Sequence, residues 1–431
     1  MANEQYTNTG KLSFGVEMEF YICWARRGTE GSAPVPEPFK SHPGGPISTV
    51  PVALQTYAAE NLDTRIRQFV QGLPAPATVV PSTQIQMNDV DPNLEHLRYY
   101  QEWQVVSDMS LVPLHGDLVS QRGRDWGWTG VEVISPALWA TDENFNHVRK
   151  VCEFIRNTFW TSTHRSAGLH VHVGNGKDYF PIPSLTRLAA FLYAADPILA
   201  QCHPEHRHMN GYCSSIRLGS MIASQDATDS EPDPAELEQG SEPTPPQWFD
   251  ISSFFQNLFT CTPKPPVNMR NKEEREEDRF PPRPRKAVYD LPRGRISLLD
   301  AVRALLRQTD RVQIANLMFT DLFGSSCVFP DPDMEMKRTI EFRRAASSVD
   351  AAEVVSQARF AVSLCEFAIN STQEDFKKTI LDFDTSDDHP TWFDVYDLLI
   401  ELGLRPEARV IYAALTGTMT DAIRTRYWSS R

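Results

Sequence analysis

Alternation between apolar and polar residues is the clearest pattern in the chain, and it recurs in residues 14–20, 168–174 and 339–343. Side chains of a β-strand point to opposite faces with a period of two, so each stretch predicts a strand with one apolar face. The other face carries an unusual selection of reactive side chains in every case. These are Glu17 and Glu19 in the first strand, His170 and His172 in the second, and Glu341 and Arg343 in the third.

A fourth and weaker copy of the pattern, residues 130–136, places Glu132 between two valines. A sheet with one solvent-exposed face is common, and any single strand of the four fits that explanation. The four strands together favour a different explanation, a bound cation, because two carboxylates on one face of a strand repel each other unless a cation lies between them. Glutamates and imidazoles on one sheet face indicate a metal site, and an arginine suits an anionic group bound to that metal.

Helical spacing of apolar residues predicts most of the remaining elements. Residues 101–111 predict a strand that ends in a turn at Asp108 and Ser110, where turn chemistry and a binding role fit equally well. Residues 312–322 fit either a strand or a helix. The predicted helices are 52–71, 142–160 with Asp142 as N-cap, one from Pro183, 297–308, one that begins after Asp350 with a capping box, and two that begin near Trp392 and Pro406.

The segment 223–295 differs in composition from the rest of the chain. It is acidic at first and then basic and proline-rich, which predicts a largely disordered surface insertion. An amphipathic stretch, 248–260, interrupts it, and a lid over the site is the alternative interpretation. The length of 431 residues and the 41% hydrophobic content allow one elaborate domain or two. We expect residues 11–222 and 296–431 to form a single catalytic domain.

Charge and cysteine content narrow the function classes. A formal net charge of −14 argues against a nucleic-acid surface, which requires a basic patch. The seven cysteines are scattered without a CxxC pair, which fits reduced thiols in the cytoplasm. Residues 1–11 are polar and show no signal peptide, and no apolar run approaches the ~20 residues that span a bilayer. We therefore expect a cytoplasmic protein with no membrane or nucleic-acid partner.

Several common catalytic motifs are absent from the sequence. It contains no P-loop, no GxGxxG after a predicted strand, no GxSxG nucleophile elbow and no HExxH zinc motif. Residues 202–213 contain three histidines and two cysteines, but their spacing matches no standard zinc pattern, so a polar loop is the favoured interpretation. The carboxylates and histidines of the predicted strands are therefore the principal candidate chemistry.

The strand motifs also occur in an order that resembles a known family. The segments 14–19, 103–111, 130–136, 168–173 and 339–343 follow one another as in the amidoligases, a branch of the glutamine synthetase-like carboxylate–amine ligases. Residues 207–213 are similar to the segment that follows the histidine strand in that family. The resemblance covers about residues 11–220 and 310–370, and the insertion between them has no counterpart. Met109 stands where the family pattern has glycine.

The resemblance implies an α+β fold, in which a curved, mostly antiparallel sheet has helices on its outer face, as in the catalytic domain of glutamine synthetase. ATP and two or three Mg²⁺ ions, with Mn²⁺ as an alternative, would lie on the concave side. Either His170 or His172, with His170 favoured, would bind a metal or a nucleotide phosphate. The implied metal ligands are Glu17, Glu19, Glu132, His170 and Glu341. The implied catalytic residues are Arg343, Arg207 and Glu341, of which the arginines would stabilise the transferred phosphoryl group or hold the substrate carboxylate.

These residues lead to one main hypothesis and two alternatives. The main hypothesis is an ATP-dependent ligase that joins a small carboxylate and a small amine through an acyl phosphate, with metals and arginines neutralising charge. The first alternative is a zinc or manganese hydrolase that uses the His-x-His strand. The second is a non-catalytic relative that only binds its ligand. We expect the protein to be a monomer or a homodimer.

Overall fold

The structure is a computed structural model in which the chain forms two compact units. The first unit comprises residues 1–178, 345–359 and 421–431, and the second comprises 179–344 and 360–420. The described residues are 11–29, 48–50, 55–80, 96–97, 100–107, 111, 126–208, 211–224, 296–319, 325–330, 337–390 and 392–429. The predicted turn at Asp108 and Ser110 and nearly all of the predicted insertion lie outside them.

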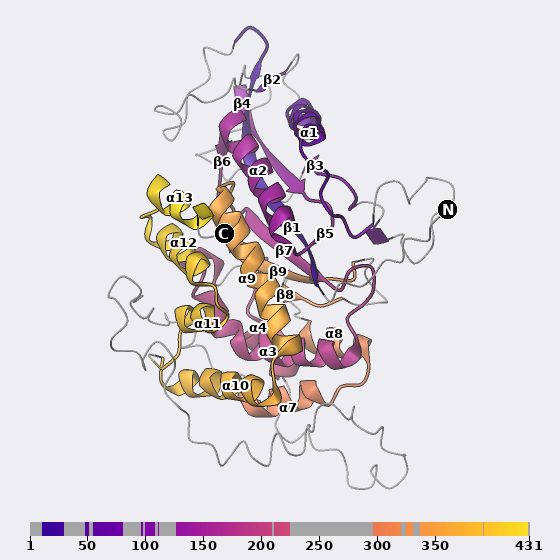
Figure 1. Cartoon of the computed structure of the whole chain (residues 1–431), viewed down its shortest axis with the longest axis vertical. Helices are drawn as coiled ribbons and strands as arrows, with labels where there is room; N and C mark the ends of the chain where they lie inside the picture. Colours follow the sequence, from indigo (N-terminus) through magenta and orange to yellow (C-terminus); the bar gives the residue numbers. More distant parts are fainter. Residues whose placement is uncertain are drawn as a thin grey trace. The chain divides into compact units, whose positions relative to one another are not determined.

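A sheet built around one long strand forms the centre of the first unit (Figure 1). That strand is β1 (Ser13–Arg26), and its length lets other strands pair along both of its edges. The antiparallel neighbours β4 (Trp126–Ile134) and β7 (Gly168–Gly174) lie on either side of it, and β3 (Gln104–Ser107) extends the sheet beyond β4. Three short strands also pair with β1, namely β2 (Ser48–Val50) in parallel, and β5 (Leu138–Trp139) and β6 (Thr161–Ser162) antiparallel.

The even-numbered residues of β1 form an apolar face that is covered by helix. Between residues 14 and 20 these side chains are at most 2% exposed. The ring of Phe145 stacks on that of Phe14 at 4.4 Å, and the Cys152 sulfur lies 3.6 Å from that of Met18. The helices of this region are α1 (Gln55–Gln71) and α2 (Asp142–Thr158). The apolar face is therefore core, and the opposite face of β1 carries the glutamates.

Helix α3 (Ile182–Ala200) is the centre of the second unit and is buried along almost its whole length. The Phe191 ring lies 6.1 Å from that of Phe376 and 5.5 Å from that of Phe383 on the neighbouring helix. Among its described residues, this unit also contains the α-helices α4 (Ile216–Gly219), α7 (Leu298–Leu306), α8 (Arg311–Met318), α10 (Gln373–Asp388), α11 (Val395–Glu401) and α12 (Arg405–Thr416).

Four further elements of the described residues are two strands and two helices. The antiparallel pair of β8 (Cys327–Val328) and β9 (Ile340–Ala346) belongs to the second unit as far as residue 344. Helix α9 (Ala351–Asn370) begins in the first unit and ends in the second. Helix α13 (Asp421–Ser429) belongs to the first unit, where Arg424 donates to Asp350 at 2.6 Å.

The predicted α+β class with a mostly antiparallel sheet is confirmed. Residues 312–322, for which strand and helix were both open, contain the helix α8. The prediction of Asp142 as N-cap of α2 is wrong, because the hydroxyl of Thr141 caps the helix by accepting from the Asn144 N–H. Helices α10 and α13 were not predicted.

None of the described helices combines the length and the apolarity that crossing a membrane requires. The six described cysteines are all buried, and no disulfide joins them. Burial raises the pKa of the Cys23 thiol to about 12. Burial also raises the pKa of Cys152, Cys213, Cys327 and Cys365, so these five thiols are protonated at neutral pH.

Candidate metal centre

The register of β1 against its two neighbours brings predicted metal ligands to one face of the sheet. In an antiparallel pair, residues directly opposite each other point to the same face. Glu17 lies opposite His170 on β7, and Glu19 lies opposite Glu132 on β4. His172 follows two residues after His170 and therefore shares this face. Three strands therefore bring five side chains together in one group: Glu17, Glu19, Glu132, His170 and His172.

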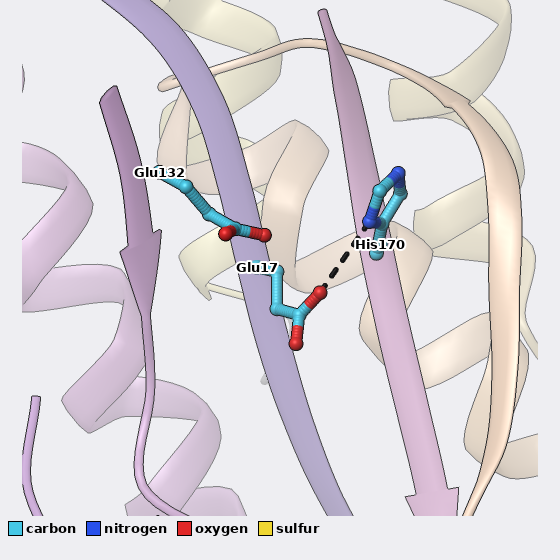
Figure 2. A group of neighbouring side chains, drawn as sticks. All are labelled: Glu17, Glu132 and His170. Carbon is cyan, nitrogen blue, oxygen red and sulfur yellow. Dashed lines mark hydrogen bonds and ion pairs between the residues drawn. The ribbon is translucent and has the colours of Figure 1, made fainter. Parts of the chain in front are cut away.

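Glu17 is at the centre of this group (Figure 2). Its Oε2 lies 3.4 Å from Nδ1 of His170, and its Oε1 lies 3.1 Å from Nε2 of His172. One ligand atom from each of Glu17, Glu132 and His170 lies within 4.8 Å of the other two. Ligands bonded to one Mg²⁺ at ~2.1 Å are at most ~4.2 Å apart, so small side-chain rotations would complete such a site.

Glu19 accepts a hydrogen bond from a backbone N–H of the neighbouring strand β7. Its Oε2 accepts the Gly168 N–H at 2.6 Å, and its Oε1 lies 3.5 Å from Nε2 of His170. The hydroxyl of Ser347 donates to its backbone carbonyl. A carboxylate on the second ring nitrogen commonly orients a metal-binding histidine. This geometry suits an orienting role of Glu19 toward His170, and its role as a direct ligand stays a prediction.

Burial makes the charges of this group unfavourable without a cation. Glu17 and His170 are each 5% exposed, Glu19 and His172 are each 8% exposed, and Glu132 is half-buried. Neighbouring carboxylates removed from water repel each other and lose hydration. Carboxylate oxygens with one or two imidazole nitrogens accommodate Mg²⁺, Mn²⁺ or Zn²⁺. The residues present therefore fit a divalent cation.

Two more predicted site residues lie on β9 in the second unit. Nη1 of Arg343 donates to Oε1 of Glu341 at 2.9 Å. Glu341 is 6% exposed, whereas the Arg343 side chain is 28% exposed. Nε of Arg343 is buried and has no hydrogen-bond partner among the described residues. Because a guanidinium binds planar anions through adjacent N–H groups, this edge of Arg343 suits an anionic group.

Arg207, the other predicted catalytic arginine, is almost completely buried at 1% exposure. Its Nη2 donates to the carbonyl of Arg343 at 2.7 Å, and its Nε donates to that of Arg344 at 3.3 Å. Its observed contacts are therefore with the backbone of β9, and contact with a substrate stays a prediction. The polar-loop interpretation of residues 202–213 stays a prediction.

Residues 10–240 match the family described as "putative amidoligase enzyme", and the match covers more than half of the 431 residues. The chain belongs to the amidoligase family. No curated protein matches this amidoligase. Membership in this family indicates a ligase. The match confirms the family resemblance that the strand motifs predicted for about residues 11–220.

The matched residues of this amidoligase contain the whole glutamate and histidine group of the first unit. Glu341 and Arg343 lie outside the match, so their place in the family pattern still rests on the resemblance of residues 339–343. The candidate metal ligands of the first unit therefore all lie within the residues that the family match covers.

Three supporting residues of this amidoligase were not predicted from the sequence. Gly168 and Ser347 hold Glu19, and Asp196 on α3 binds Arg344 at 2.8 Å. The sequence did contain a signal for Asp196, because it is the single acidic residue in the apolar helix α3 and a buried carboxylate requires polar partners. The role of Ser347 had no signal in the sequence, since its hydroxyl reaches a residue 328 positions away.

Proposed function

We propose that this amidoligase is an ATP-dependent carboxylate–amine ligase that uses Mg²⁺, with Mn²⁺ as an alternative. The observation that carries the proposal is the group of the buried Glu17 and His170 and the half-buried Glu132, whose ligand atoms lie within 4.8 Å of one another, so that small side-chain rotations would let them share one cation. Family membership supplies the ligase class. The buried Nε of Arg343, which has no hydrogen-bond partner among the described residues, supports an anionic substrate or phosphoryl group.

The chemistry requires activation, because a carboxylate oxygen is a poor leaving group toward an amine at neutral pH. In the proposed reaction a carboxylate oxygen attacks the γ-phosphorus of ATP, and the bond to the β,γ-bridging oxygen breaks to release ADP. The amine nitrogen then attacks the acyl carbon, the carbon–oxygen bond to phosphate breaks, and the nitrogen loses a proton. The products are an amide, ADP and phosphate.

The protein residues have distinct roles in this proposal. A bound divalent cation would neutralise phosphate charge and align the γ-phosphoryl group. Glu17, Glu132 and His170 would hold it, while Glu19 keeps the imidazole in place. Arg343 would hold a phosphoryl oxygen or the substrate carboxylate, and Glu341 stays the further ligand that the resemblance implies. Burial would limit the access of water, which competes with the amine for an acyl phosphate.

The test is phosphate release from Mg²⁺·ATP with pools of carboxylic acids and amines, measured for wild type, Glu17→Gln and Glu153→Gln. The second variant is a matched control, since it removes one negative charge from the partly exposed pair of Glu153 and Arg149 on α2. We expect turnover that requires Mg²⁺ and both pools. It should fall by about 100-fold or more in Glu17→Gln, because even outer-shell changes at metal sites cost ~10- to 100-fold. Glu153→Gln should behave like wild type.

Other outcomes would support other functions. Full turnover in Glu17→Gln would remove Glu17 from the metal site and with it the observation that carries the proposal. Hydrolysis without ATP, sensitive to a zinc chelator, would support the hydrolase alternative, which the pairing of Glu17 with His170 and His172 also suits. Tight binding of Mg²⁺·ATP without turnover in any pool would support the non-catalytic alternative.

A further inference from the structure

The two faces of β9 carry different kinds of polar residue. Glu341 and Arg343 share one face, and Arg344 points to the opposite one because side chains alternate along a strand. The Arg344 side chain is 5% exposed and forms an ion pair with Asp196 at 2.8 Å. The strand that carries the candidate anion-binding arginine is thus attached to α3 through its other face.

Asp196 is the point where three segments of the second unit meet. Its carboxylate accepts from the hydroxyl of Ser215 at 2.5 Å and from that of Ser326 at 2.8 Å, in addition to Arg344. Its backbone carbonyl accepts from Nη1 of Arg344 at 2.9 Å. Asp196 itself is 2% exposed. A buried carboxylate with this many partners fixes the relative position of the elements that supply them.

Arg207 contacts the backbone of the same strand, β9. The short strand β8 pairs only with residues 341 and 342 of β9, and the Arg343 N–H donates to the Ser326 carbonyl at 3.0 Å. Beyond that point, Nη2 and Nε of Arg207 donate to the carbonyls of Arg343 and Arg344, respectively. Because buried carbonyls require donors, Arg207 takes the place of a strand partner where β8 has ended.

We propose that Arg207 and Asp196 are positioning residues that fix the direction of the Arg343 side chain toward its anionic ligand. The inference rests on the proposed function for the identity of that ligand, Mg²⁺·ATP. A planar guanidinium can hold two neighbouring carbonyls in one geometry, which neither an apolar side chain nor a lysine ammonium reproduces. Catalytic groups need positions accurate to ~0.5 Å, so release of β9 would misplace Arg343 without removing it.

The experiment compares Arg207→Met with Arg187→Met in the full chain. Arg187 is a matched control in the same unit, because it is 3% exposed and also donates to two backbone carbonyls, those of Ala368 at 2.6 Å and Ser371 at 2.8 Å. Those carbonyls belong to the end of α9 and to the residue that follows it, and neither belongs to β9. Both variants should lose similar stability, so a difference between them reports on β9.

Two readouts are measured. The first is hydrogen exchange of peptides that cover residues 340–344, which needs no ligand. The second is the affinity for Mg²⁺·ATP and the turnover with the substrate pools. We expect Arg207→Met to lose exchange protection in β9 and to lose turnover by about 100-fold, as for a misplacement of ~1 Å. Arg187→Met should keep both near wild type. Arg207→Lys, which keeps the charge but lacks the planar fork of N–H groups that holds both carbonyls in one geometry, should lie between wild type and Arg207→Met.

The outcomes separate this inference from the proposed function. Unchanged exchange of β9 in Arg207→Met would overturn it whatever the ligand data show. Equal loss of affinity and turnover in Arg207→Met and Arg187→Met would reduce Arg207 to a stabilising residue. If wild type fails to bind Mg²⁺·ATP, the proposed function falls, and the exchange data still decide whether Arg207 holds β9. If Arg207→Met does not fold, Asp196→Asn and Arg207→Lys are compared with Arg187→Met in the same way.

Discussion

Replacing Glu17 by glutamine should stabilise the metal-free protein and at the same time abolish its response to Mg²⁺. The ligand oxygens of Glu17 and Glu132 lie within 4.8 Å of each other. At an effective dielectric constant of about 20, two unit charges at that distance repel by roughly 3.5 kcal/mol. Glu132 is half-buried and partly screened by solvent, so we expect Glu17→Gln to gain about 1–3 kcal/mol in the absence of metal.

The assay is urea denaturation near pH 8, in chelator and with saturating Mg²⁺. A ligand that binds only the folded protein stabilises it by about 2.7 kcal/mol at 100 times its Kd. Wild type should show a gain of this kind, and Glu17→Gln should show almost none. Glu153→Gln, with its partly exposed charge, should change by less than about 0.5 kcal/mol and keep the Mg²⁺ response.

One result would refute the electrostatic reasoning directly. If Glu17→Gln is less stable than wild type in chelator and still gains full stability from Mg²⁺, the carboxylates neither repel in the metal-free protein nor share the cation. A variant that is less stable in chelator and has also lost the response would instead place the main contribution of Glu17 in its contacts with the two histidines.

Three further predictions concern the surroundings of the site. Gly127→Ala should destabilise the fold by about 1–3 kcal/mol in urea denaturation, because a Cβ would lie 2.7 Å from the buried Trp24 ring. Burial, and secondarily a nearby lysine, lowers the pKa of His147. The contribution of His147 to stability should therefore be complete above pH ~6.5 and should be lost as the pH falls through the lower pKa that His147 has in the folded protein. Denaturation measured across pH should show this dependence in wild type and a flatter one in His147→Gln. Ser347→Ala removes the hydroxyl that donates to Glu19 and should lower the unfolding free energy by about 1 kcal/mol, with the Mg²⁺ response retained.

The candidate site was predictable to the extent that strand periodicity determines it. A period of two places Glu17 with Glu19 and His170 with His172 on single faces, and this needs no knowledge of the fold. The helices with clear apolar spacing were predictable for the same reason. Helix α10 was missed although Phe376, Ile380 and Phe383 have helical spacing, because charged residues fill most of its other positions.

Pairing between distant strands could not be predicted from local pattern. Nothing in residues 14–20 determines that Glu17 lies opposite His170, since a shift of register along the strand would exchange its partner. The contacts of Glu19 depend on the same register, as its acceptor role requires the Gly168 N–H at that position. Arg207 shows the limit most clearly, because a loop arginine with a polar environment in the sequence is buried on backbone carbonyls in the fold.

The central position of β1 has a consequence for the synthesis of the chain on the ribosome. Glu17 and His170 are 153 residues apart, so at ~5–20 residues per second the second ligand is made about 8–30 s after the first. Until residue 134 is made, β1 has neither of its two main neighbours, and until residue 174 it still lacks β7. Nascent chains that end before β7 should therefore expose an unpaired edge of β1 and depend on chaperones, and Glu17 and His170, two of the proposed metal ligands, are not yet both present in them.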